Sequence, residues 1–407
     1  MIQPKVIWNA KDHPELHSGY GVLTRHLVPR LVNHYGSDSV LVYAPVYAKR
    51  VEDWNGIYIL PGDNNEYEGG LLLNHYEQQE ANLLITVGDW FQFRQVPQWA
   101  GEDKITWVQW GAYDFLNTPP WLKDILRFAL KVVPFCDDAG ERFRKLGLEN
   151  VTDSIYLGLD QEIWTPFQSN PDQASQIGFQ PDTYNIVIVA ANQHRKNIRE
   201  MLEGIKMFHE MTPEAKCRIY LHTMVEGDRN IELDLKELEL EKITTLPSNY
   251  DLICGTFTEA QMSTVFNAAD IVLDVCMEGF GLSQTQAQAF GIPVVYLNEG
   301  AGAELVKYGC EVPYFSVDRN HNLSKPIPNP GNIAEAIDVL WREFEKGNKR
   351  SDTAIKWTQE NLGWDLIAEK WISMIDEIMA IQESHSYYIP SPAEHLIERS
   401  KNMVELA

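Results

Sequence analysis

The chain has 407 residues and a formal net charge of −24, with 44% hydrophobic and 11% aromatic residues. A globular chain of this length is expected to form two domains, each with its own core, and no apolar run approaches the roughly 20 residues that span a bilayer. The strong acidity argues against a general nucleic-acid binder, and the lack of a polybasic helix argues against a protein held on anionic lipid.

A strand and a glycine-containing loop open the chain. Residues 6–8 are apolar and predict a strand, and apolar residues recur at helical spacing over residues 22–32. Gly19 and Gly21 lie between these segments, where glycine lets the backbone approach a ligand closely. A plain tight turn explains the two glycines equally well from this half of the chain alone.

Acidic residues follow two of the next strands. Further strands are predicted at residues 40–43, 82–87, 105–108 and 131–135. Asp89 comes just after the second of these, and Tyr113 and Asp114 follow the third. Because the carboxyl ends of parallel strands meet at one edge, these side chains should face a cleft, where the carboxylates could bind hydroxyls or act as a base. Turn formation, which Asp also favours, remains an open alternative.

The middle of the chain is predicted to be a linker. Residues 166–181 contain three prolines and several Ser, Asn and Gln residues without periodicity. We therefore expect a first domain over residues 1–165 and a second over residues 182–360. Residues 361–407 should hold a long helix with an apolar stripe and a tail that is helical in pattern near its end.

Two cations stand at the start of a helix in the second half. A strand is predicted at residues 186–190, and Arg195 and Lys196 follow it just before a helix with one apolar face. Cations oppose the dipole at a helix N-terminus, which favours anions there. A diphosphate bound between the two cations would explain their placement, and a solvated basic turn is the alternative.

A glycine turn joins a later strand to a helix. Strands are predicted at residues 218–222, at 250–254 before Gly255, and at 271–275. The last one runs into Glu278, Gly279, Phe280, Gly281 and Leu282, and a helical pattern continues to residue 291. Such a turn places backbone N–H groups and Glu278 at the ligand-binding edge of a parallel sheet. An ordinary turn with an acid favoured by the helix dipole is the alternative.

The segment from Glu278 to Leu282, with the helix and strand that follow, resembles the donor-site signature of the retaining GT-B glycosyltransferases of family 4. The resemblance implies two Rossmann-like domains facing across a cleft, with a C-terminal helix that crosses back to the first domain. In that family a first glutamate, matched by Glu278, contacts the donor sugar. A second, eight residues later, holds the ribose, and here that position is Gln286.

The resemblance also implies roles for the loop cations. Lys196 matches the family's lysine, whereas Arg195 is offset from the usual arginine position, which Asn192 occupies. Many relatives carry a histidine after the strand at 105–108, and none is present here. The implied catalytic residues are Glu278, Arg195, Lys196 and Asp114. The implied donor-binding residues are Gly19, Gly21, Asn192, Gly255, Gly279, Phe280, Gly281, Leu282 and Gln286, and the implied acceptor-binding residues are Asp89 and Tyr113.

The function that follows from the resemblance is transfer of a sugar from a nucleoside-diphosphate sugar to a hydroxyl of a glycan, lipid or small molecule. The chain offers Arg195 and Lys196 for the diphosphate and no Asp-x-Asp pair after a strand, so no metal or other cofactor is expected. Gln286 and the missing histidine favour an alternative, a catalytically degenerate module that binds sugar nucleotides or a partner. A viral-type enzyme that glycosylates modified DNA bases is a third possibility, and the acidic charge weighs against it.

Cysteine usage and the start of the chain indicate a cytoplasmic location. The five cysteines have no close pair, which suits reduced thiols and predicts neither a disulfide framework nor a zinc site. The first residues show no basic-then-apolar secretory pattern.

Overall fold

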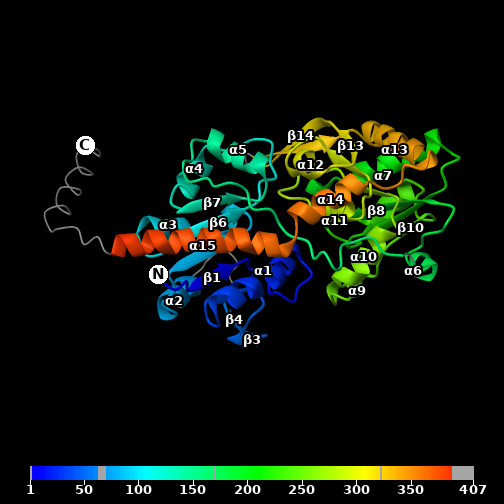
Figure 1. The fold of residues 1–407 in the computed structure, drawn as a ribbon. Coiled ribbons are helices and arrows are strands. Elements are labelled where there is room, and N and C mark those ends of the chain that lie inside the picture. The colour runs from blue at the N-terminus through cyan, green and yellow to red at the C-terminus, as the bar shows by residue number, and fades with distance from the viewer. Residues whose placement is uncertain (1, 63–69, 169, 321–322, 387–407) are drawn as a thin grey trace.

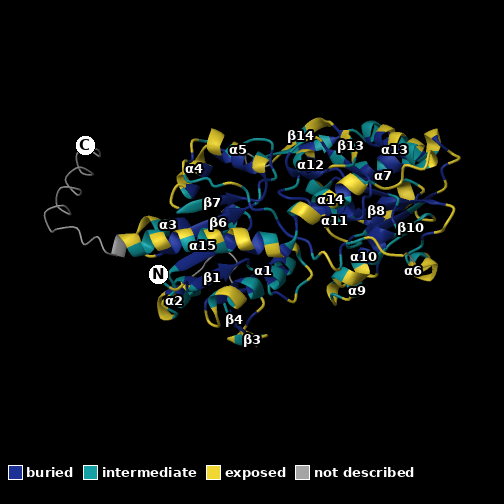
Figure 2. Ribbon diagram, viewed as in Figure 1, coloured by how far each residue is buried: buried dark blue, intermediate teal, exposed yellow. Residues whose placement is uncertain are grey.

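The computed structural model describes residues 2–62, 70–168, 170–320 and 323–386. The N-terminal half of the chain, blue to cyan in Figure 1, and the C-terminal half apart from its last helix form two lobes that lie side by side. Each lobe is built on its own sheet. The inner strands of both sheets are deeply buried, as the dark blue ribbon in Figure 2 shows.

The first sheet has seven strands in the order β3-β4-β2-β1-β5-β6-β7. They are β1 (Val6–Asn9), β2 (Val40–Tyr43), β3 (Glu52–Trp54), β4 (Ile57–Leu60), β5 (Leu83–Val87), β6 (Trp107–Gly111) and β7 (Lys131–Pro134). All neighbours are parallel except β3 and β4. Most of the strands are short apolar runs buried on both faces, as expected of a parallel sheet covered by helices.

Helices connect the strands of the first sheet. They are α1 (Gly19–Tyr35), α2 (Gly70–Gln78), α3 (Val96–Gly101), α4 (Trp121–Leu126), α5 (Asp137–Lys145) and the 3-10 helix η1 (Trp90–Gln92). Helix α1 begins after Ser18, whose hydroxyl accepts a hydrogen bond from the backbone N–H of Gly21 at 3.0 Å. This cap fixes the point where the loop after β1 turns into the helix.

The second sheet has six parallel strands in the order β10-β9-β8-β11-β12-β13. They are β8 (Tyr184–Val189), β9 (Cys217–His222), β10 (Thr244–Thr245), β11 (Ile271–Asp274), β12 (Val294–Leu297) and β13 (Gly309–Val312). The helices of this half are α6 (Pro171–Gln176), α7 (Ile198–Met211), α8 (Ile231–Glu237), α9 (Asn249–Ile253), α10 (Glu259–Asn267), α11 (Leu282–Ala289), α12 (Ala301–Leu305), α13 (Pro330–Glu345) and α14 (Asp352–Asn361). An antiparallel hairpin of β14 (Tyr314–Asn320) and β15 (Leu323–Pro328) follows β13.

Both sheets contain a point at which the winding direction reverses. In the first sheet the chain moves outward from β1 to β2 and β4, then returns to place β5 on the other side of β1. In the second sheet β8 and β11 are related in the same way. Loops that leave such neighbouring strands diverge and open a crevice, which is where open α/β sheets bind ligands. The loops after β1, β5, β8 and β11 are therefore the places to look for a site.

The last described helix crosses back onto the first half, as predicted. Helix α15 (Trp364–Ser386) lies along α1 and β1 in Figure 1. The fully buried Trp371 meets Trp8 and Trp110 edge to face, with ring centroids 5.8 and 5.1 Å apart. The beginning of the chain and its last described helix therefore share one core.

Two expectations about elements need correction. A strand is predicted at residues 250–254, but residues 250–253 belong to α9, because Ser248 caps a helix there by accepting from the N–H of Asp251 at 3.1 Å. The strand predicted at residues 105–108 begins at Trp107, later than expected, and runs to Gly111. Gln109 is therefore a buried strand residue. The predicted linker contains helix α6. The predicted tail helix lies outside the described residues.

Among the described residues no helix is both long enough and apolar enough to cross a membrane.

Candidate active site

The two predicted cations lie in the 3-10 helix η2 (His194–Lys196), which follows β8. Asn197, the next residue, has a left-handed backbone with φ of 51°, a conformation that Asn tolerates better than most residues. Its buried amide donates hydrogen bonds to the backbone carbonyls of Val275 at 2.9 Å and Pro326 at 3.3 Å. These bonds tie the turn that carries the cations to the end of β11 and to β15.

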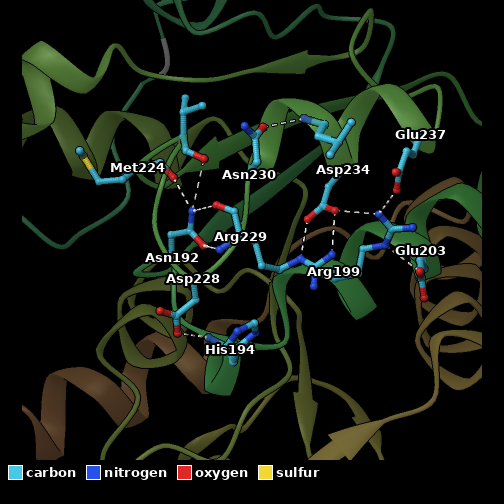
Figure 3. Close-up of polar contacts among 12 residues, drawn as sticks. Asn192, His194, Arg199, Glu203, Met224, Asp228, Arg229, Asn230, Asp234 and Glu237 are labelled. Carbon is cyan, nitrogen blue, oxygen red and sulfur yellow. Dashed lines mark hydrogen bonds and ion pairs between the residues drawn. The ribbon is translucent and has the colours of Figure 1, made fainter.

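A second loop is bound to this turn through Asn192, as Figure 3 shows. The amide nitrogen of Asn192 donates to the carbonyls of Met224 at 3.0 Å and Arg229 at 2.9 Å. Its oxygen accepts from the N–H of Arg229 at 3.2 Å, and a Cβ on Gly227 would lie only 2.6 Å from the carbonyl oxygen of Asn192. The side chain predicted to bind the donor thus holds residues 224–229 in place.

An ion-pair network connects the loop at residues 224–229 to helices α7 and α8. Asp234 of α8 accepts from Nε of Arg229 at 2.6 Å and from Nη1 of Arg199 at 2.7 Å (Figure 3). The hydrogen bond from Arg229 outweighs burial and lowers the pKa of Asp234. Because Arg199 lies in the first turn of α7, the network joins α7, α8 and the loop at residues 224–229 into one support for the cation-bearing turn.

Glu278 lies where both cations converge. Its carboxylate contacts the ammonium of Lys196, and its Oε2 lies 3.9 Å from Nη1 of Arg195. Burial alone would raise the pKa of Glu278, but the charges of Lys196 and Arg195 outweigh burial and lower the pKa to about 2. Glu278 is therefore ionised at neutral pH inside a nearly buried cluster.

Two more ionisable side chains, Asp274 and Cys276, lie next to Glu278. Cys276 Sγ lies 3.0 Å from Oδ1 of Asp274 and 2.9 Å from Oε1 of Glu278. Burial raises the pKa of the Cys276 thiol well above its ordinary value, and burial with the charge of Glu278 raises the pKa of Asp274 to about 6. One ligand atom from each residue lies within 4.8 Å of the others, so the three could hold a metal ion. The ammonium of Lys196 already supplies positive charge at this position.

The predicted acids of the first half face the cations of the second. Oδ2 of Asp114 lies 3.3 Å from Nη1 of Arg195, an ion pair that bridges the two halves. Burial and the charge of Asp114 raise the pKa of Asp89 to about 6. The other oxygen of Asp114 is buried without a hydrogen-bond donor among the described residues. A ligand hydroxyl could donate to it.

Sequence reasoning missed two residues at this junction. Lys325 of β15 places its ammonium 3.7 Å from Oδ2 of Asp114 and 4.6 Å from the ring centroid of Phe115. Tyr20 of α1 is half-buried near Asp89, and loss of solvent around its hydroxyl, with that charge, raises the pKa of Tyr20 well above its ordinary value. Neither has a local signal, since Lys325 sits in a hairpin far along the chain and Tyr20 resembles any helix-packing tyrosine.

The glycine turns of the two halves meet. A Cβ on Gly19 would lie 3.3 Å from the Leu282 side chain, and a Cβ on Gly255 would lie 2.9 Å from the ring of His17. A Cβ on Gly279 would clash with Ala112. The approach at Gly19 brings the start of α1 against the turn after β11, and a residue without a Cβ leaves room for it.

A second contact closes the junction on the side of α10. Glu259, the first residue of that helix, lies 2.8 Å from Nε2 of His26 and 3.1 Å from Nη2 of Arg25. It also accepts from the indole N–H of Trp164 at 3.3 Å. Although burial would raise its pKa, His26 and the other donors lower the pKa of Glu259 to about 2. His26 thus links the two halves.

The remaining predicted site residues are Tyr113, Gln286, Phe280 and Gly21, and most of them are buried or tightly packed. Tyr113 is 1% exposed, its hydroxyl donates to the carbonyl of Asn117, and its ring packs on Phe143, so it offers no free group in this conformation. Gln286 is half-buried in α11, one turn beyond Leu282. Two others serve packing. Phe280 is 3% exposed, and a Cβ on Gly21 would clash with the carbonyl of Leu16.

The arrangement gathers three cations and three carboxylates at the two crevices. The cations are Arg195, Lys196 and Lys325, and the carboxylates are Asp89, Asp114 and Glu278. Fixed cations in a partly buried site can stabilise a diphosphate and the charge that develops when it leaves. Carboxylates beside them can bind sugar hydroxyls.

Comparison with known proteins identifies the fold. No protein-family model matches the chain. Spore coat protein SA of Bacillus subtilis is 19% identical over 236 residues, which cover 56% of this chain and 59% of that protein. D-inositol 3-phosphate glycosyltransferase of Paenarthrobacter aurescens is 22% identical over 214 residues, which cover 52% of this chain and 48% of that protein. The chain thus aligns with only about half the length of these relatives.

Solved structures match over nearly the whole chain. Sucrose-phosphate synthase from Thermosynechococcus elongatus superposes with a TM-score of 0.73 at 15% identity, covering 93% of this chain and 100% of that one. Anabaena HepE in complex with UDP-glucose gives 0.66 at 14% identity, covering 91% and 99%. An E. coli trehalose-6-phosphate protein bound with UDP-2-fluoro glucose gives 0.67 at 12% identity, covering 90% and 98%. The predicted GT-B fold is therefore confirmed.

Proposed function

We propose that this protein is a retaining glycosyltransferase of the family 4 type, which moves a hexosyl group from a nucleoside-diphosphate sugar to an acceptor hydroxyl. The observation that carries the proposal is the convergence of Arg195 and Lys196 on Glu278 at the crevice of the second sheet, opposite Asp114 of the first. The two cations can stabilise a diphosphate, and the carboxylates can accept hydrogen bonds from the hydroxyls of a sugar beside it.

The donor binds chiefly to the second half. Arg195 and Lys196 hold the diphosphate, and Glu278 orients the sugar through its hydroxyls. Backbone groups around Gly19 approach the phosphates from the first half, consistent with the contact between Gly19 and Leu282. HepE and the E. coli protein were solved with UDP-glucose and a UDP-glucose analogue, which makes UDP-glucose the first donor to test.

In the proposed reaction the acceptor oxygen attacks the anomeric carbon from the side on which the diphosphate leaves. The new C–O bond forms as the bond to the phosphate oxygen breaks, and the acceptor proton passes to that phosphate oxygen. The products are a glycoside of unchanged anomeric configuration and a nucleoside diphosphate. The protein contributes by positioning the reactants and by stabilising the diphosphate charge through Arg195 and Lys196.

The acceptor binds chiefly to the first half. The free oxygen of Asp114 and the carboxyl of Asp89 lie where they can receive hydroxyl groups, next to the proposed sugar site. The acceptor is accordingly a polyol or a sugar.

A screen of nucleotides tests the proposal. UDP, ADP, GDP and their glucose conjugates are added to the protein, and at least one should raise the melting temperature, since a ligand of the folded state stabilises it. Incubation with that donor and a panel of sugar acceptors should release nucleoside diphosphate, and proton NMR of a product from an α-linked donor should show an α linkage. A β-linked product would refute retention. Binding without transfer or donor hydrolysis would support the degenerate-module alternative.

A further inference from the structure

The guanidinium of Arg195 lies close to two carboxylates, those of Asp114 and Glu278. Its Nη1 lies 3.3 Å from Asp114 and 3.9 Å from Glu278, so the group proposed to hold the diphosphate is paired with carboxylates. To reach a diphosphate, Arg195 must give up part of its contact with Asp114. A buried carboxylate that loses its counter-ion is strongly disfavoured, so Asp114 will retain Arg195 unless another cation takes over.

Lys325 is that other cation. Its ammonium lies 3.7 Å from the same Oδ2 of Asp114 and above the ring of Phe115 at 4.6 Å. The side chain is 26% exposed, and burial lowers the pKa of Lys325 while Asp114 opposes the shift. Oδ2 of Asp114 thus lies near two cations, Arg195 and Lys325. Of these, Arg195 is the one proposed to bind the diphosphate.

The hairpin is built to deliver Lys325 to this position. Leu116 donates its N–H to the carbonyl of Ser324 at 2.8 Å, and the N–H of Ser324 donates to Oδ1 of Asn117 at 2.7 Å. These bonds dock β15 directly on the segment after Asp114. Asn197 adds a third bond, from the cation-bearing turn to Pro326 of the same strand at 3.3 Å.

We infer that Lys325 is a positioning residue that serves as the standing counter-ion of Asp114, so that Arg195 is free to bind the donor diphosphate. The inference rests on the proposed function and extends it. Lys325 does not itself contact the nucleotide. It acts through Asp114, and its effect on donor affinity exists only while Asp114 carries a charge.

Titration calorimetry with a nucleoside diphosphate tests the inference, using whichever of UDP, ADP and GDP binds the wild-type protein most tightly. Lys325→Met should weaken binding by about 10-fold, because Arg195 remains with Asp114. Lys325→Arg, which restores the charge, should bind within about 2-fold of wild type.

The second half of the test removes the acid. Asp114→Asn needs no counter-ion, so adding Lys325→Met to Asp114→Asn should change the affinity by less than about 2-fold. If the 10-fold loss persists in the Asp114→Asn background, Lys325 contacts the diphosphate directly and the inference is wrong. It is equally wrong if Lys325→Met alone leaves affinity unchanged.

The matched control is Lys307→Met. Lys307 also lies 4.6 Å from an aromatic centroid, that of Trp357, but away from the carboxylate cluster, so its loss should not change nucleotide affinity. Melting temperatures establish that each variant is folded, and Lys325→Gln replaces Lys325→Met if the latter is not. If wild type and Lys307→Met bind none of the three nucleotides, the proposed function itself fails, an outcome distinct from a Lys325 variant that binds normally.

Discussion

At the scale of single residues, the site consists of charged side chains that are largely shielded from solvent and paired with one another. Glu278 is 14% exposed and yet ionised, because Lys196 and Arg195 surround it. The same cations are proposed to meet the diphosphate, so the carboxylate also holds them in place before the donor arrives. This arrangement gives Glu278 two roles, in orienting the sugar and in organising the cations.

Replacing Glu278 should therefore affect turnover much more than folding. Glu278→Ala is expected to reduce kcat by about 10²-fold or more, the scale seen when a charge-positioning group is removed. The measurement is a steady-state assay of nucleoside diphosphate release with the preferred donor. Glu241→Ala, at an exposed site, is the control and should match wild type. Wild-type turnover in Glu278→Ala would overturn the assignment.

Asp89 predicts a pH dependence of stability. Its pKa is raised from 3.8 to about 6 on folding, so ionising it costs the folded state stability once the pH exceeds the unfolded value. The cost grows from about pH 4 to pH 6 and is constant above that. Asp89→Asn removes it and should raise the free energy of unfolding more at pH 8 than at pH 5. Urea denaturation at both values measures this, and an equal gain at both would show that Asp89 has an ordinary pKa.

Gln286 is expected to hold the nucleotide ribose more weakly than a glutamate would. A glutamine keeps one acceptor oxygen and carries no charge, and charge-assisted hydrogen bonds are roughly twice as strong as neutral ones. Gln286→Glu should tighten nucleotide-sugar binding by about 1 kcal/mol in a calorimetric titration. Unchanged or abolished binding would mean that Gln286 is not at the ribose, or that the donor is not a ribonucleotide.

At the scale of elements, local patterns could be read and distant pairings could not. The strand, glycine turn and helix around Glu278 follow from adjacent residues, because Gly281 takes a positive φ and α11 starts at the next residue. The segment at residues 250–254 was misread as a strand. Tyr250 and Ile253 are each 74% exposed, so their apolar character does not reflect burial.

The position of Lys325 in the β14–β15 hairpin could not be predicted from the sequence. Lys325 reaches the site only because β15 docks on residues 116 and 117, about two hundred positions earlier in the chain. No local pattern encodes that contact. The packing of Tyr113 against Phe143 is also a contact between separate segments, since Phe143 lies in helix α5.

Helix α15 should be essential to the stability of the first half. Trp371 is fully buried between Trp8 and Trp110, and its indole N–H has no hydrogen-bond partner among the described residues, so its contribution is packing. Trp371→Ala should lower the free energy of unfolding by about 3–5 kcal/mol in urea denaturation. Trp121→Ala, at a ring that is 38% exposed, should cost less. Equal effects would contradict the shared core.

At the scale of the whole molecule, a net charge of −24 coexists with a site rich in cations. The positive charge that a diphosphate needs is placed locally, by Arg195, Lys196 and Lys325, rather than drawn from the composition. This is why overall charge could exclude classes of partner but could not locate the site.

The same cations lead us to expect transfer without a divalent metal. Although Asp274, Cys276 and Glu278 could together hold an ion, Lys196 already lies against Glu278. Activity should survive dialysis against EDTA with less than about 2-fold loss, since the fixed cations can stabilise the leaving diphosphate. Loss of activity that manganese or magnesium restores would assign that cluster to a metal instead.

The packing of Trp371 against Trp8 also has a consequence for how the protein is made. The two residues are 363 positions apart, and a ribosome adding about 5–20 residues per second needs roughly 20 to 70 s to go from one to the other. Throughout that interval the first sheet lacks the helix that completes its core, while the second sheet, whose strands all lie between the two tryptophans, can fold as it emerges. The half that is synthesised first is thus the last to be finished, and until then Trp8 and Trp110 form an apolar surface that a chaperone could shield.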